Sequence, residues 1–158
     1  ENNQEETEYD TRDEESSPYL LEAAQKLIEK NWTLSFDTLQ PEWLPKDWEV
    51  TRRKPKAFHG DFACGSKVIK MDSPWFQDIQ KLAGKRNIIA VEMEGEGVLL
   101  ACKRFRPSPE FIMIKGISDF ANPEKTDKYK RISSVAAARF LLDMLSLPNI
   151  RRIINNRH

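Results

Sequence analysis

The sequence predicts an α/β fold with three layers, α/β/α, in which helices cover both faces of a mostly parallel, mixed sheet. Residues 88–91 (Ile-Ile-Ala-Val) form a short apolar run that is typical of a strand buried on both faces. Strand patterns and helix patterns also alternate along the chain, which favours parallel strands joined by helices. Three or four strands are expected, so the chain should supply only part of the domain.

The chain opens with an acidic segment and continues into an amphipathic helix. Residues 1–16 are rich in Asp and Glu and lack apolar periodicity, so we expect a flexible segment in a chain cut from something longer. Ser17 and Pro18 are residue types preferred at the N-cap and the first position of a helix. Apolar residues then recur at helical spacing as far as Lys30, which predicts a helix that covers the sheet.

Residues 32–48 hold three tryptophans and two prolines with poor periodicity. We expect a loop or lid that aromatic side chains fix to the rest of the domain. The alternative is an insertion that caps the site or contacts a partner, in which case Trp32, Trp43 and Trp48 are exposed interface residues of a homo-oligomer.

The remainder of the chain alternates between strands and helices. A strand is predicted over 57–64, and Gly65 interrupts it before Val68 and Ile69. The further elements are helices over 73–84, 95–105 and 133–145 and strands over 88–91 and 111–117, with Pro148 ending the last helix. The predicted domain therefore covers residues 17–148, and residues 149–158 form a basic tail.

Composition argues against several classes of protein. The chain has 25 basic and 25 acidic residues and a formal net charge of zero, whereas general binders of nucleic acids or membrane surfaces usually carry a basic surplus. No apolar run reaches the roughly 18 residues of a membrane helix. Cys64 and Cys102 are isolated, so we expect buried thiols in a reducing cytosol rather than a metal site or a disulfide. The predicted protein is cytoplasmic, with no metal, membrane or nucleic-acid partner.

Acidic residues follow both apolar strands, at the edge where open α/β sheets bind ligands. Glu92 and Glu94 come directly after 88–91, and Ser118 and Asp119 follow the next strand. Glu94 begins a helix, whose dipole favours an anion, whereas partial desolvation favours the protonated form of Asp119. One charged and one protonated acid suit the cleavage of a glycosidic bond. The alternative is that Glu94 is an N-terminal helix acid and Asp119 caps a turn.

Three motifs together resemble the nucleoside phosphorylase / nucleosidase superfamily, which includes purine nucleoside phosphorylase, uridine phosphorylase and methylthioadenosine/S-adenosylhomocysteine nucleosidase. They are Val-Glu-Met-Glu-Gly at 91–95, Ile-Lys-Gly-Ile-Ser-Asp at 114–119, and Ala-Cys-Gly-Ser-Lys-Val-Ile at 63–69. The resemblance covers about residues 58–145. It implies a phosphorylase/hydrolase-like fold of which this chain is the C-terminal portion.

The resemblance implies a role for each residue on the sugar side of a nucleoside. Met93 is expected to pack against the ribose, and Glu94 is expected to accept hydrogen bonds from the ribose hydroxyls. Glu92 is expected to orient the loop.

On the base side, the resemblance implies that Asp119 donates a proton or a strong hydrogen bond to N7 of the departing purine, with Ser118 supporting it. Val68 and Ile69 are expected to line the base pocket. The family often carries an aromatic residue at the position of Val68, so base stacking is expected to be weaker or different here. Lys115 stands where several members carry an arginine and is expected to hold Asp119 in place.

The implied function is cleavage of the N-glycosidic bond of a purine nucleoside. A purine is favoured over uracil because an acid, Asp119, faces the leaving base. The family's glycine-rich phosphate loop and its nucleophile-activating groups belong to the N-terminal half of the domain, and this chain contains only six glycines and no such loop. Hydrolysis and phosphorolysis both stay open. No cofactor is expected, and phosphate is a co-substrate only if the reaction is phosphorolysis.

Two other functions remain as alternatives. One is a non-catalytic module that senses nucleosides or serves as a scaffold in a larger multidomain protein. The other is a structural α/β domain in which the acids are coincidental. The resemblance also implies a homo-oligomer, because the family assembles as dimers or hexamers.

Overall fold

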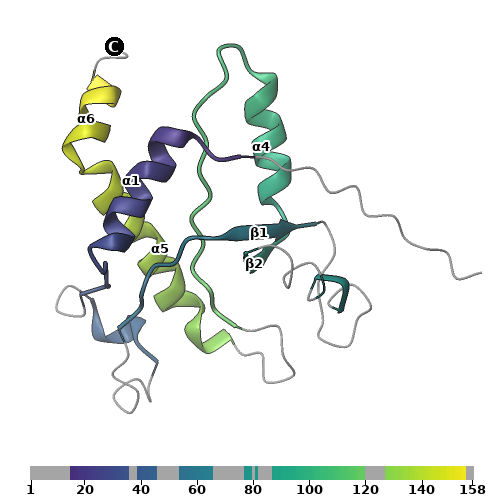
Figure 1. Ribbon diagram of the computed structural model, residues 1–158. Coiled ribbons are helices and arrows are strands. Elements are labelled where there is room, and N and C mark those ends of the chain that lie inside the picture. Colours follow the sequence, from purple (N-terminus) through teal and green to yellow (C-terminus); the bar gives the residue numbers. More distant parts are fainter. Residues whose placement is uncertain are drawn as a thin grey trace, which may run out of the picture.

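The structure, a computed structural model, describes residues 15–35, 39–45, 54–65, 77–79, 81, 87–119 and 127–155. Its helices and its small parallel sheet confirm a mixed α/β fold (Figure 1). In chain order the elements are α1 (Pro18–Glu29), the 3-10 helix η2 (Pro41–Trp43), β1 (Asp61–Cys64), β2 (Ile88–Glu92), α4 (Gly95–Arg104), the 3-10 helix η3 (Asp127–Tyr129), α5 (Lys130–Leu145) and α6 (Pro148–Asn155).

The described sheet consists of β1 and β2, which run parallel. Asp61 pairs with Ile88 and Cys64 pairs with Glu92, with an irregularity after Asp61. The prediction of strands at 57–64 and 88–91 is confirmed, although β1 is shorter than predicted. Parallel pairing brings the carboxyl ends of both strands to the same edge, directly before α4 begins.

The strand predicted over 111–117 is not paired with the sheet in the described part of the chain, so that prediction is wrong as stated. Figure 1 shows this segment running from the end of α4 past the sheet towards the start of α5. Its side chains still alternate: Ile112 and Ile114 pack against the helical core, whereas Met113 and Lys115 approach the turn before α4. The apolar pattern therefore reflects packing on a helical core rather than ladder hydrogen bonds.

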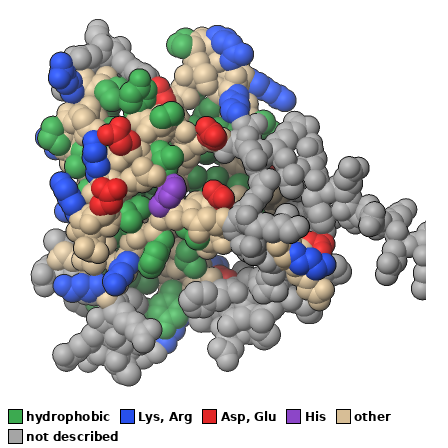
Figure 2. All heavy atoms as spheres, in the orientation of Figure 1, with side chains coloured by type: hydrophobic (Ala, Val, Ile, Leu, Met, Phe, Trp, Pro, Cys, Tyr) green, Lys and Arg blue, Asp and Glu red, His purple; other side chains and the backbone are tan. Residues whose placement is uncertain are grey.

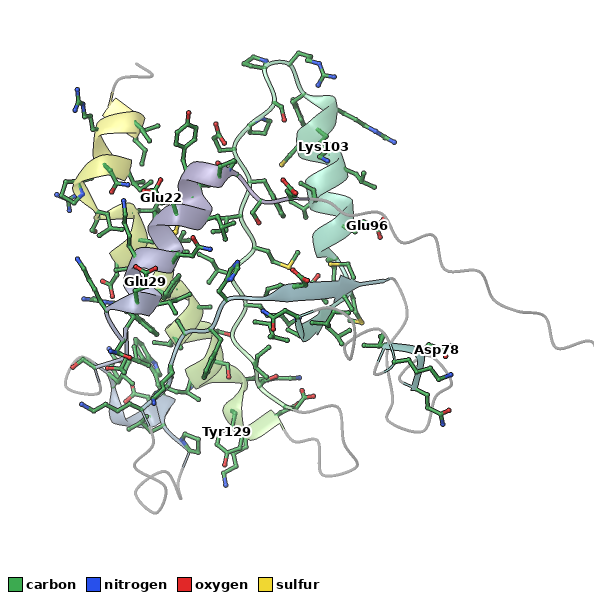
Figure 3. The ribbon with its side chains drawn as sticks, viewed as in Figure 1. Glu22, Glu29, Asp78, Glu96, Lys103 and Tyr129 are labelled. Carbon is green, nitrogen blue, oxygen red and sulfur yellow. The ribbon has the colours of Figure 1, made fainter. Side chains whose placement is uncertain are left out.

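The predicted helices over 17–30, 95–105 and 133–145 correspond to α1, α4 and α5, of which α5 begins three residues earlier than expected. Of the helix predicted over 73–84, residues 77–79 and 81 are described and are helical. Helix α4 carries Glu96 in its first turn and Lys103 in its last turn (Figure 3), which matches the polarity of the helix dipole.

Residues 148–155 form the helix α6, whereas the sequence analysis predicted a basic tail from residue 149. Pro148 ends one helix and starts another, because proline is unfavourable inside a helix but suits its first position. Ile150 is buried in the helical core and Ile153 is half-buried against it. The apolar side of α6 therefore packs against the helical core, whereas Arg151 and Arg152 are exposed to solvent.

The main core lies where α1, α5 and α6 meet. Its buried members are Ala23, Ala24, Phe140, Met144 and Ile150. The two alanines allow α1 to approach closely, and Met144 is fully buried between the helices.

Every described helix is too short or too polar to cross a lipid bilayer. Figure 2 shows basic and acidic side chains interspersed on the visible face.

Trp32 belongs to this core rather than to an exposed interface. Its ring packs edge-to-face against the ring of Phe140, with 5.1 Å between the ring centroids. Its indole N–H donates a hydrogen bond to the Asp143 carboxylate at 2.8 Å. The expectation that Trp32 is an exposed interface residue is therefore wrong, because its ring covers the side of α5. Trp43 is half-buried, and Trp48 lies outside the described residues, as do residues 1–14 of the predicted flexible segment.

Replacing Trp32 by phenylalanine is expected to lower the free energy of unfolding by about 1 to 2 kcal/mol, since the hydrogen bond to Asp143 and part of the packing of the larger indole ring are lost. Asp143 would retain its ion pair with Arg139 at 3.1 Å. The difference in unfolding free energy between the two proteins is measured by urea denaturation monitored by circular dichroism. A variant as stable as the parent would show that this hydrogen bond contributes nothing.

Candidate functional site

The candidate site lies at the carboxyl ends of β1 and β2. The backbone N–H of Gly65 donates to the carbonyl of Glu92 at 3.0 Å, which extends the pairing of the strands to their last residues. Met93 and Glu94 then form the turn that leads into α4, with Glu94 at the N-cap position. Ligands bind at this edge in open parallel sheets because strands end and helices begin there.

Glu92 holds this turn in place. Its carboxylate accepts the backbone N–H of Glu94 at 2.6 Å and that of Gly95, and it forms an ion pair with Lys115 at 3.0 Å. Burial by itself raises the pKa of Glu92, but the N–H of Gly95, the Lys115 ammonium and the N–H of Glu94 together lower the pKa below its ordinary value. The carboxylate is therefore ionised at neutral pH, and its side chain is only 14% exposed.

The turn leaves Met93 and Glu94 facing solvent. Met93 is 42% exposed, and the Glu94 side chain is exposed and makes no capping hydrogen bond. Because Glu92 takes the capping role, the Glu94 carboxylate is available to a ligand.

The segment that carries Ser118 and Asp119 packs against the same turn. A Cβ added to Gly95 would lie 2.1 Å from the terminal methyl of Met113, so the Met113 side chain packs directly against the Gly95 backbone. Together with the ion pair between Lys115 and Glu92, this contact fixes the segment beside the start of α4.

Asp119 itself lies near the start of α5. Ser118 donates a hydrogen bond to the Asp119 carboxylate at 3.2 Å, and both residues are half-buried. The hydroxyl of Ser133, in the first turn of α5, donates to the carbonyl of Ile117 at 2.7 Å. Gly116 lies directly against the Ser133 backbone. Asp119 thus belongs to a segment that is fixed against the start of α5 through Gly116 and Ile117, while Glu94 is the N-cap residue of α4.

The structure brings some of the predicted residues together and not others. Glu92 is joined to Lys115, and Ser118 to Asp119. The expectation that Lys115 holds Asp119 is not met, since its ion pair goes to Glu92. The predicted base-pocket residues Val68 and Ile69 lie outside the described residues.

Two of the cavities that described residues line are placed away from this turn. One, of about 240 Å³, lies between the start of α1 and the end of α4 and is lined by Ser17, Cys102 and Lys103 among others. The other, of about 160 Å³, is an apolar pocket between α1 and α6. Neither of these two cavities is lined by Glu94 or Asp119.

Three residues that matter to the site were not singled out from the sequence: Met113, Gly116 and Ser133. Gly116 lies inside the Ile-Lys-Gly-Ile-Ser-Asp motif, and an isolated glycine in a strand-like run can indicate close backbone approach. Ser133 gave no signal, because a serine in the first turn of a helix is common.

Cys64 lies beside the acids of the turn. Burial raises the pKa of its thiol, and the carboxylates of Glu92 and Glu96 raise it further, while the N–H of Glu96 and the Lys115 ammonium act in the opposite direction. The group is therefore a protonated, poorly nucleophilic thiol near neutral pH. Among the described residues, no cluster of His, Cys, Asp and Glu is arranged to hold a metal ion.

A pH titration of thiol alkylation tests this electrostatic environment. In a Cys102→Ala background, alkylation of Cys64 by iodoacetamide is expected to be slow near neutral pH and to rise only above the ordinary thiol pKa of about 8.5. Glu96→Gln removes a nearby negative charge, so it should lower the pKa and shift the profile to lower pH. Glu22→Gln, on the exposed side of α1, should leave the profile unchanged. A profile that Glu96→Gln does not move would contradict the stated cause.

No protein-family model matches the chain, and no solved structure matches it. Over 101 residues, 63% of the chain, the sequence is 27% identical to a nucleotide-binding leucine-rich repeat (NLR)-like protein of Hyaloscypha variabilis. The matched region spans 9% of the length of that relative.

Proposed function

We propose that this chain is the C-terminal portion of a domain that cleaves the N-glycosidic bond of a purine nucleoside. The observation that carries the proposal is the turn at residues 92–95. It lies at the carboxyl ends of two parallel strands, exposes Met93 and Glu94, and is tied through Glu92 and Lys115 to the segment that ends in Asp119.

In this proposal, Glu94 accepts hydrogen bonds from the ribose hydroxyls and Met93 packs against the sugar. As the bond to the base weakens, positive charge develops on the sugar, and a nearby carboxylate stabilises it. Asp119 donates a proton or strong hydrogen bond to N7 of the leaving purine, and Ser118 orients it. Leaving-group protonation of this kind contributes about 10² to 10⁴ in rate.

The nucleophile side of the site is assigned to residues that precede this chain in the complete domain. Whether water or phosphate attacks is set there, so phosphate is proposed only as a co-substrate of the phosphorolytic case. Val68 and Ile69 are proposed to line the base pocket. The protein is proposed to be cytoplasmic and to form a homo-oligomer.

We also propose that the complete domain has the three-layer α/β/α architecture. An isolated pair of parallel strands is marginal, because parallel sheets are normally covered on both faces and contain more strands.

A second candidate is a non-catalytic, nucleoside-sensing or scaffold domain of a larger multidomain protein. The observation that favours it is the relative, which is much longer than the matched region and whose name describes nucleotide binding and leucine-rich repeats. This candidate retains the nucleoside site but lacks turnover.

One experiment separates the two candidates. The full-length protein is incubated with inosine or adenosine, with and without phosphate, and free base is measured by chromatography while binding is measured by calorimetry. Base release supports the enzyme, and dependence on phosphate identifies phosphorolysis. Binding without release supports the sensing domain. Absence of both binding and release would reject both candidates.

A further inference from the structure

The ion pair between Glu92 and Lys115 differs from the surface pairs of the chain. It joins residues 23 positions apart, and its side chains are 14% and 34% exposed. By contrast, Lys26–Glu22 on α1 is a local pair with side chains that are 49% and 60% exposed. Exposed local pairs contribute little to stability, whereas a partly buried pair between two segments restrains both of them.

The two oxygens of the Glu92 carboxylate have separate partners. Oε1 accepts from the Lys115 ammonium, and Oε2 accepts the backbone N–H groups of Glu94 and Gly95. The contact with the Lys115 ammonium therefore fixes the orientation of the Glu92 carboxylate, whose other oxygen binds the turn. With both oxygens engaged, Glu92 does not need a substrate hydroxyl to satisfy its charge.

We propose that Glu92 and Lys115 form a positioning pair that fixes the Met93–Glu94 turn for the sugar, and that Glu92 does not itself contact the substrate. This inference rests on the proposed nucleoside function and changes the role of Lys115 from a support of Asp119 to a support of the ribose side. Displacement of a substrate-contacting group by about 1 Å can cost on the order of a hundredfold in rate.

The test compares Lys115→Met, which removes the charge but keeps an unbranched side chain, with Lys115→Arg, which can rebuild the pair. In the full-length protein, Lys115→Met is expected to weaken inosine binding by about tenfold to a hundredfold, the change in affinity that corresponds to losing a hydrogen bond to a charged group when Glu94 is displaced. It should also speed hydrogen exchange, measured by mass spectrometry, in the peptide that contains the Glu94 and Gly95 amides. Lys115→Arg should restore both quantities. Lys26→Met, which breaks the exposed pair on α1, serves as the matched control and should change neither.

The possible results separate this inference from the proposed function. If the parent protein binds inosine and Lys115→Met binds it equally well, the positioning role is wrong although the nucleoside site stands. Faster exchange at the turn with unchanged inosine affinity likewise contradicts the positioning role. If the parent protein binds no nucleoside, the proposed function fails and this inference fails with it.

Discussion

Replacing Gly116 by alanine is expected to lower the free energy of unfolding by about 3 kcal/mol, at the upper end of what overpacking costs. A Cβ at this position would lie 2.0 Å from the carbonyl oxygen and 2.4 Å from the carbonyl carbon of Ser133. These are backbone atoms of a helix, which cannot rotate away as a side chain can. Either the segment that carries Asp119 or the start of α5 would have to move.

Gly97→Ala provides a matched control. Gly97 lies inside α4, and a Cβ there would meet nothing within 4 Å. The same substitution should therefore raise stability by roughly 0.5 to 1 kcal/mol, because alanine is the better helix former. Urea unfolding of the two variants gives the comparison. A Gly116→Ala protein as stable as the parent would show that the segment is not held against α5 as described.

In the proposed reaction, Asp119→Asn is expected to lower kcat for purine release by about 10² to 10⁴. Asparagine keeps the shape of the side chain but cannot donate the proton that the leaving base requires. Glu94→Gln should act differently, raising KM through weaker ribose binding as well as lowering kcat. Steady-state rates of base release with inosine, measured for each variant, distinguish the two roles.

Asp127→Asn is the control for this pair of variants. Asp127 is an acid of the 3-10 helix before α5, it is exposed, and its ion pair with Lys130 lies on the surface. Its replacement should leave kcat and KM unchanged. Unaltered base release by Asp119→Asn would exclude Asp119 as the proton donor.

The elements that depend on local sequence were predictable. Ser17 and Pro18 marked the start of α1, and the apolar run at 88–91 marked β2. Pro148 predicts the end of α5, but the sequence does not indicate its second role as the first residue of α6, because a short amphipathic helix of eight residues resembles a basic tail in composition.

The long-range contacts of the site were not predictable. The apolar run at 111–117 is compatible with a paired strand and with an extended segment packed on helices, and only the position of the helical core decides between them. Glu92 and Lys115 could each be found near the site from their motifs. Their pairing could not, since it depends on how the 111–119 segment lies against the turn before α4.

The most direct measurement is a crystal structure of the full-length protein with a purine nucleoside bound. We predict one nucleoside that spans both motifs, with ribose hydroxyls donating to the Glu94 carboxylate and Asp119 within hydrogen-bonding distance of N7. Carboxyl groups of Glu94 and Asp119 on opposite faces of the sheet, or a nucleoside bound away from both, would contradict the proposed site.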